Sequence, residues 1–354
     1  MNLKQLLQQY TKDQRTEKFV QVLQQQERPA IQLKGLIGSQ LAFVVAATRS
    51  LVTPPFLIIA SDKEEAAYWQ NDISALLAKN REALFFPDSY RRPMGFDKLD
   101  RTNVLQRTET VSNLVEHPNA PAIVVTYPEA LFEKVVAPSN LKEAAIEIKV
   151  GTELDVPFLN EILIEYGFKR VDFVYEPGQF SIRGGIIDIY SYGNEHPYRV
   201  ELFDVEVETI RTFDPTTQLS TRNIAFVTIV PNVNTEFKAE EKVALLEVLP
   251  PETVVWLSDA TMLLDKLQLC FEKSKEDTAN METIVHKARH EESLLLQEAA
   301  FLFPREIMGA LNNFAVVELG NEPSRPANHS IVYKTTPQPN FCLLYTSPSP
   351  RDRG

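Results

Sequence analysis

Apolar residues along the first 136 positions alternate between two spacings. Short runs of consecutive apolar residues predict buried strands at 30–33, 55–60, 83–86 and 122–126. Between these runs, apolar residues spaced along one helical face predict helices at 1–27, 62–78, 102–114 and 128–136. Alternation of strands and helices predicts a mostly parallel sheet with helices on its faces.

The pattern changes near residue 140. A helix at 154–166 is followed by runs that alternate apolar and polar residues, at 171–175, 179–183, 186–190, 198–203 and 207–213. Short Gly- and Pro-containing turns join these runs, so they predict an antiparallel meander in a separate α+β unit. The α/β rhythm then returns, with strands predicted at 253–257 and 314–318 and charged helices over about 259–300.

These patterns predict an α/β domain interrupted by an inserted domain. The expected layout is a first part of the parallel-sheet domain at 1–137, an inserted α+β domain at 138–213 and completion of the parallel-sheet domain at 214–341.

Composition narrows the class of protein. The chain of 354 residues is 44% hydrophobic and 24% charged, with a formal net charge of −12. That charge disfavours a large nonspecific DNA-binding surface, which needs clustered Lys and Arg. The two cysteines, Cys270 and Cys342, are too few for a disulfide framework. With no long apolar run and no signal-peptide pattern at the start, we expect a cytoplasmic protein without a membrane segment.

The last residues resemble a reagent sequence. Back-translation of residues 342–352 gives a nucleotide string similar to a transposon-based sequencing-library adaptor. We therefore expect residues 342–354 to be an artefactual tail on a truncated gene fragment, and Cys342 to be non-native. A natural Ser/Pro-rich linker is the alternative interpretation.

A strand-to-helix turn occupies the position of a phosphate-binding loop. It comprises Gly35, Gly38, Ser39, Gln40, Leu41 and Ala42. A working loop reads GxxxxGK[ST], but here Gln40 replaces the second Gly, Leu41 the Lys and Ala42 the Ser or Thr. Leu cannot hold the phosphates and Ala cannot bind Mg²⁺, so the segment is either a degenerate phosphate loop or an ordinary turn. Both interpretations argue against nucleotide hydrolysis.

Two other sets of residues are weaker candidates for a metal site. His286 and His290 are four apart on a predicted helix, but Lys287 breaks the HExxH pattern, and a solvated helix face explains the pair. Four acidic residues lie on the predicted meander, and the last three recur at every second position, as exposed strand positions do. They are Asp188, Asp204, Glu206 and Glu208. The sequence predicts no catalytic residues and no metal site.

Three linked motifs in the meander carry a family resemblance. They are QFSIRGGIIDIY at 179–190, YRVELF at 198–203 and IRTFDPTTQ at 210–218. In this order they resemble the UvrB interaction domain, which occurs in UvrB and in bacterial transcription-repair coupling factors. The degenerate loop, and a short segment at 91–101 where UvrB has a long aromatic hairpin, make the chain more similar to the coupling factors.

The resemblance implies a non-catalytic module that recruits UvrA in nucleotide-excision repair. It implies a helicase-like fold for the parallel-sheet domain, and no cofactor for this fragment. ATP with Mg²⁺, RNA polymerase and DNA would be bound by downstream domains, which in that family form an ATP-dependent DNA translocase. We expect a monomer. The alternatives are a divergent UvrB-type ATP-dependent helicase subunit and a purely structural spacer.

The resemblance also implies the residues that contact UvrA. They are Lys169, Arg170, Phe180, Arg183, Arg199 and Glu201. Alternation along a strand independently predicts that Arg199 and Glu201 share one face, with Tyr198, Val200 and Leu202 on the other. A solvated sheet face is the alternative interpretation of this pattern.

Overall fold

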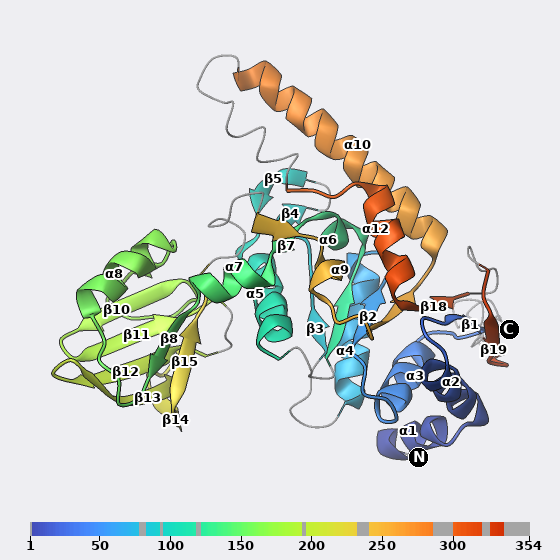
Figure 1. The fold of residues 1–354 in the computed structure, drawn as a ribbon, viewed down its shortest axis with the longest axis horizontal. Helices are drawn as coiled ribbons and strands as arrows, with labels where there is room; N and C mark the ends of the chain where they lie inside the picture. Colours follow the sequence, from blue (N-terminus) through green and yellow to red (C-terminus); the bar gives the residue numbers. More distant parts are fainter. Residues whose placement is uncertain are drawn as a thin grey trace, which may run out of the picture.

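The computed structural model describes residues 2–77, 83–92, 95–117, 122–192, 196–231, 241–285, 300–320 and 326–335. His286, His290, Cys342 and the predicted artefactual tail lie outside this range. Figure 1 shows two parts, a larger α/β body and a smaller unit at one end. Within the described residues, none of the helices combines the length and the apolar character needed to cross a membrane.

The body is built on a parallel sheet, as the sequence predicts, and this sheet has seven strands. Its central strands are fully buried apolar runs such as FLII and VVWL, as expected where helices cover both faces. In spatial order the strands are β19 (His329–Val332), β1 (Ala30–Lys34), β18 (Ala315–Leu319), β17 (Val254–Leu257), β2 (Phe56–Ile59), β6 (Ile123–Thr126) and β3 (Leu84–Phe85).

Helices surround this sheet (Figure 1). Several of them begin where a polar side chain satisfies a free backbone N–H group; Asp62, for example, accepts from Glu65 N at 2.8 Å. The helices are α1 (Leu3–Thr11), α2 (Gln14–Gln25), α3 (Gln40–Arg49), α4 (Lys63–Leu76), α5 (Arg101–Glu116), α6 (Pro128–Phe132), α9 (Leu245–Val248), α10 (Ala260–Val285) and α12 (Pro304–Ala310), with a 3₁₀ turn at Leu311–Asn313. A small hairpin joins β4 (Tyr90–Arg92) to β5 (Gly95–Leu99).

The smaller unit is an insertion between two short strands of the body. The chain leaves through β7 (Val135–Val136) and returns through β16 (Lys242–Val243), and these strands pair antiparallel. The described residues of the insertion form a six-stranded sheet, the two-stranded β8–β15 sheet and two helices. Its elements are α7 (Pro138–Ala144), β8 (Ile146–Lys149), α8 (Val156–Glu165), β9 (Lys169–Arg170), β10 (Gln179–Arg183), β11 (Ile186–Tyr190), β12 (Tyr198–Phe203), β13 (Glu206–Phe213), β14 (Ser220–Ile224) and β15 (Phe226–Ile229).

The insertion has its own hydrophobic core. Leu159 and Leu163 of α8 pack against the sheet residues Phe180, Ile187 and Val200. These residues form a cluster separate from the main core of the body. Strands β10 to β13 form the predicted antiparallel meander.

Several predicted elements differ from those in the structure. The expected boundary at residue 213 falls inside the six-stranded sheet, because β14 pairs with β13 and β15 then pairs with β8. Residues 171–175, predicted as a strand, form a loop that lies on the sheet. Val174 of this loop is fully buried against Tyr190 and Phe213 of the sheet. The helix predicted at 128–136 ends at Phe132, because Val135 and Val136 pair with β16 instead.

Two further differences lie at the ends of the body. The single helix predicted over 1–27 breaks at Asp13, whose side chain accepts from Arg15 N and begins α2. Strand β19 was not predicted: its His and Ser residues lack the apolar run of a central strand, and it lies at the edge of the sheet.

Candidate functional site

In the turn that resembles a phosphate loop, the backbone and side chains contact other groups of the protein. Gly35 has φ +75°, and a β-carbon there would collide with the carbonyl oxygen of Tyr333 in the chain beside it. The Ile37 N–H donates to Gln40 Oε1 at 3.0 Å, and Ser39 Oγ lies 3.3 Å from the Tyr68 hydroxyl. Packing against Tyr333 therefore explains Gly35 without a nucleotide.

The first turn of α3 also packs against the hydrophobic core of the body. Leu41 and Ala42, at the positions of the phosphate-loop Lys and Ser/Thr, are buried in the core of the body. Helix α1 lies beside α3, and the rings of Tyr10 and Phe43 stack with centroids 5.2 Å apart. Gly38, with φ +57°, completes the turn.

The six-stranded sheet of the insertion has one polar face. We call the side opposite α8 the outer face, and it bears Ser181, Arg183, Asp188, Arg199, Glu201 and Arg211. Cross-strand register aligns Ser181, Asp188, Arg199 and Arg211 in one row across β10 to β13. Alternation along each strand sends the neighbouring residues into the core beneath α8.

Asp188 is the centre of this row. Its side chain is fully buried and accepts from Arg183 Nη2 at 2.5 Å, Arg199 Nε at 2.7 Å and Arg199 Nη2 at 2.9 Å. The hydrogen bond to Asp188 raises the pKa of Arg199 further above its already high value, against the effect of burial. One buried carboxylate thus pairs with two guanidinium groups.

Each arginine of this pair has further contacts. Arg199 Nη1 donates to the Gln218 carbonyl at 3.2 Å, and its guanidinium lies over the Phe213 ring at 4.6 Å. Arg183 Nη1 donates to the Asp172 carbonyl at 3.1 Å, and its guanidinium lies over the Phe173 ring at 5.0 Å. The Arg199 side chain is 16% exposed and that of Arg183 is 36% exposed, so Arg183 offers more surface to a partner.

Glu201 is paired within the outer face as well. Its carboxylate accepts from Arg211 Nη2 and from Thr209 Oγ1, both on β13. The outer face therefore carries three arginines against two carboxylates, Asp188 and Glu201.

The other predicted contact residues are dispersed. Phe180 is fully buried in the core beneath α8, so its assignment to the interface is wrong; strand alternation places it opposite Arg183. Lys169 and Arg170 are exposed on β9 at the sheet edge. Arg170 donates to Asn160 of α8 at 3.4 Å, so it lies on the helix side, whereas Lys169 pairs in register with Gln179 on the outer side.

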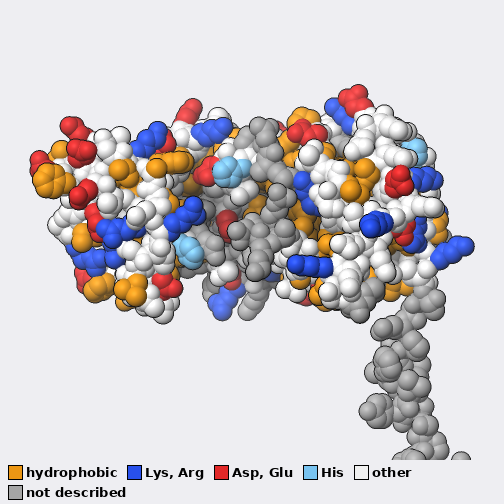
Figure 2. Space-filling view, turned by 90° about the horizontal axis from the view of Figure 1, so that it is seen from below, with side chains coloured by type: hydrophobic (Ala, Val, Ile, Leu, Met, Phe, Trp, Pro, Cys, Tyr) orange, Lys and Arg blue, Asp and Glu red, His pale blue; other side chains and the backbone are white. Residues whose placement is uncertain are grey.

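Apolar side chains are exposed around the outer face. Phe203 is 76% exposed at the turn after β12, and Leu219 is 68% exposed at the turn before β14. Phe173 and Tyr175 are about half exposed on the loop that covers the sheet. On the side of the molecule seen in Figure 2, hydrophobic and charged side chains are intermixed over the insertion, at left.

Asp188 and Arg211 also belong to this site, although neither is among the contact residues predicted from the sequence. Asp188 was considered only as a weak metal ligand, and among the described residues no group of three or more His, Cys, Asp or Glu side chains could hold a metal ion. Strand alternation alone could have placed Asp188 on the outer face, because it lies between buried Ile187 and Ile189.

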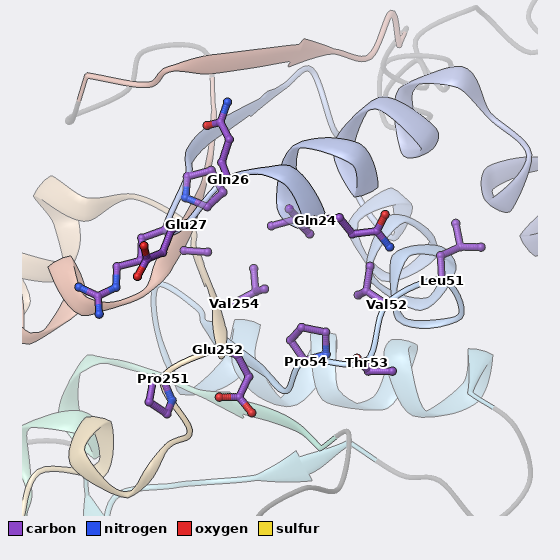
Figure 3. Close-up of a pocket in the computed structure, with 14 residues that line it drawn as sticks. Gln24, Gln26, Glu27, Leu51, Val52, Thr53, Pro54, Pro251, Glu252 and Val254 are labelled. Atoms are coloured by element: carbon purple, nitrogen blue, oxygen red, sulfur yellow. The ribbon is translucent and has the colours of Figure 1, made fainter.

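A pocket of about 550 Å³ opens on the body, at the amino ends of β2, β17 and β18 (Figure 3). Its walls are mostly aliphatic side chains and prolines, among them Val52, Pro54 and Val254. Ligands of open parallel sheets bind at the carboxyl ends of the strands, so we assign this pocket no function.

Comparison with known proteins places the outer face within a recognised domain. Residues 146–235 match the family model described as the UvrB interaction domain. The matched segment includes the strands from β8 to β15, and the three motifs of the meander lie inside it.

Three of the curated relatives share one name. The chain is 32% identical to the transcription-repair-coupling factor of Bacillus subtilis over 216 residues, which are 61% of this chain and 18% of that protein. It is 28% identical to the protein of the same name from Myxococcus xanthus, over 57% of this chain and 17% of the relative. It is 26% identical to the Escherichia coli protein of that name, over 55% of this chain and 17% of the relative. The matched part of the chain thus spans less than a fifth of these relatives.

Proposed function

We propose that this chain is the UvrA-recruiting module of a transcription-repair coupling factor and has no catalytic activity of its own. The domain type supports the choice of partner, and the relatives' name supports the process, nucleotide-excision repair coupled to transcription. Contacts with RNA polymerase and DNA, and ATP-driven movement, would belong to other segments of such a factor.

The observation that carries the proposal is the arginine pair on the outer face. Arg183 and Arg199 share the carboxylate of Asp188, so these three side chains together retain a net positive charge. Arg183, the more exposed of the two arginines, presents that charge at the surface. Arginine is suited to bidentate pairing with a carboxylate, and Phe173, Phe203 and Leu219 offer apolar contact nearby. Arginine and aromatic residues together are typical of the energetically important part of a protein interface.

The alternative of an ATP-dependent helicase subunit has less support. Gln40, Leu41 and Ala42 replace the residues that hold phosphates and Mg²⁺, and the latter two are core residues here.

The proposal predicts that Arg183→Glu weakens UvrA binding by at least about 2 kcal/mol, or roughly 30-fold in Kd. The substitution sets a carboxylate against the acidic group expected on the partner. It also sets one beside Asp188, which keeps its hydrogen bonds to Arg199, so the variant should be less stable but still fold. Calorimetric titration with UvrA from the same organism measures the loss, and circular dichroism checks the fold.

Arg222→Glu is the matched control, because Arg222 is an exposed arginine of β14 in the same domain. It makes the same charge change and should bind UvrA as the parent does. Arg199→Glu is less suitable, because Arg199 is the more buried arginine and makes two of the three hydrogen bonds to Asp188, so its loss should destabilise the insertion by about 3–5 kcal/mol. The proposal is wrong if Arg183→Glu folds and binds UvrA like the parent.

A further inference from the structure

Asp188 stands out on the outer face because no partner can reach it. Its exposed fraction is zero, and both its oxygens accept hydrogen bonds from arginines of neighbouring strands. It lies in the middle of β11, where flanking Ile187 and Ile189 anchor the strand in the core beneath α8. Its position is therefore fixed by the backbone and the core.

The carboxylate restricts both arginines. Arg199 is held by two hydrogen bonds to Asp188, one to the Gln218 carbonyl and the ring of Phe213. Arg183 is held by Asp188, the Asp172 carbonyl and the ring of Phe173. Long side chains lose rotamer freedom when they bind a partner, and a side chain that is already fixed loses less.

We propose that Asp188 is a positioning residue of the UvrA-binding face, which fixes Arg183 in the orientation that receives an acidic side chain of the partner. Asp188 acts through Arg183 and makes no contact with UvrA. This inference rests on the proposed function and adds the partner's chemistry: a carboxylate beside an apolar group that packs on Phe173.

The test is Asp188→Asn in the full chain, titrated with UvrA by calorimetry. Asn has the same shape but cannot pair with two arginines, so affinity should fall about tenfold. Ile187→Val is the control: it removes a methylene from the fully buried neighbour, and it should reduce stability while leaving affinity unchanged.

A double-mutant cycle separates positioning from general loss of structure. In an Arg183→Ala background there is no Arg183 to position, so Asp188→Asn should cost clearly less than the tenfold seen in the parent. An equal loss in both backgrounds, or no loss in the parent, overturns the inference.

If Asp188→Asn does not fold, Arg183→Lys tests the positioning role of Asp188 instead. Lysine keeps the charge but cannot bond Asp188 and the Asp172 carbonyl together as a guanidinium does, so affinity should still fall several-fold. Parent-like binding by Arg183→Lys overturns the positioning role alone, provided that Arg183→Glu loses binding. Parent-like binding by Arg183→Glu overturns the proposed function itself.

Discussion

Glu129 shows how the body holds a single carboxyl group away from water. It is the second residue of α6, it is 8% exposed, and its Oε2 has no hydrogen-bond partner among the described residues. Burial is the main cause that raises its pKa above the ordinary 4.5, with a backbone hydrogen bond and Lys266 acting in the opposite direction. The folded protein therefore binds this proton more tightly than the unfolded chain.

A raised carboxyl pKa lowers stability as the pH rises. Below the unfolded pKa both states are protonated and the group costs nothing. As the pH rises above that value, the unfolded chain ionises more readily than the folded protein, and the folded state becomes less stable. We therefore predict that Glu129→Gln raises the melting temperature at neutral pH, and that this gain disappears as the pH falls through the raised value towards 4.5. Thermal denaturation followed by circular dichroism at several pH values measures it.

Exposed Glu161 of α8 gives the control for this substitution. Glu161→Gln removes the same charge from an exposed position and should change the melting temperature little at any of these pH values. A lower melting temperature for Glu129→Gln at neutral pH would show that the carboxylate has a stabilising partner.

Strand alternation was enough to place Arg199 and Glu201 on one face, because side-chain direction has a period of two. It could not show that Asp188 pairs with both Arg183 and Arg199. Those contacts depend on the register of three strands, which no local pattern records. Phe180 was misassigned because the family motif was given more weight than the same alternation.

At the scale of elements, α3 begins where a nucleotide phosphate would be bound by a working loop. The Ile37 N–H already donates to Gln40, and the ring of Phe43, one turn along, stacks on Tyr10 of α1.

We predict that the chain binds no ATP at micromolar concentrations, with or without Mg²⁺. The missing lysine and hydroxyl are the groups that hold the phosphates and the metal, and Leu41 and Ala42 are buried instead. Calorimetric titration tests binding, with an active phosphate-loop ATPase as positive control. Saturable micromolar binding would contradict the prediction and revive the helicase alternative.

Elements were predictable where local pattern and tertiary environment agree. The runs that became β2 and β6 are buried at every position and apolar except for Thr126, as is typical of strands covered on both faces. β7 and β19 were missed because pairing with β16 and β1, far away in sequence, makes them strands. Local propensity is a weak guide for such short edge segments.

At the scale of the whole molecule, the insertion joins the body through β7 and β16. Arg107, almost fully buried beneath this junction, donates to the carbonyls of Pro87, Ala130 and Glu133. The change from the α/β rhythm to an antiparallel meander, and back again, predicted an insertion. The predicted end of the insertion at residue 213 lies too early in the chain. The polar segment of β14 carries no apolar run, so only its pairing with β13 reveals it as a strand.

The separate cores predict that the insertion folds alone. Residues 144–231 contain α8, both of its sheets and all the residues of its core beneath α8. We expect this fragment to unfold cooperatively and to bind UvrA with an affinity close to that of the whole chain, because every residue of the outer face is present. Circular dichroism and calorimetric titration measure these properties, and Arg183→Glu in the fragment should remove binding as in the whole chain.

The body provides the complementary experiment. Val136 of β7 and Lys242 of β16 are direct partners in an antiparallel pair, so their α-carbons are about 5 Å apart, and a short Gly-rich linker can replace the residues between them. The shortened chain should keep the seven-stranded sheet and a cooperative thermal transition, and should lose UvrA binding. If it retained UvrA binding, the contact would lie on the body. If the isolated fragment failed to fold, the junction with the body would be part of the insertion's stability, and the outer face would depend on the whole molecule.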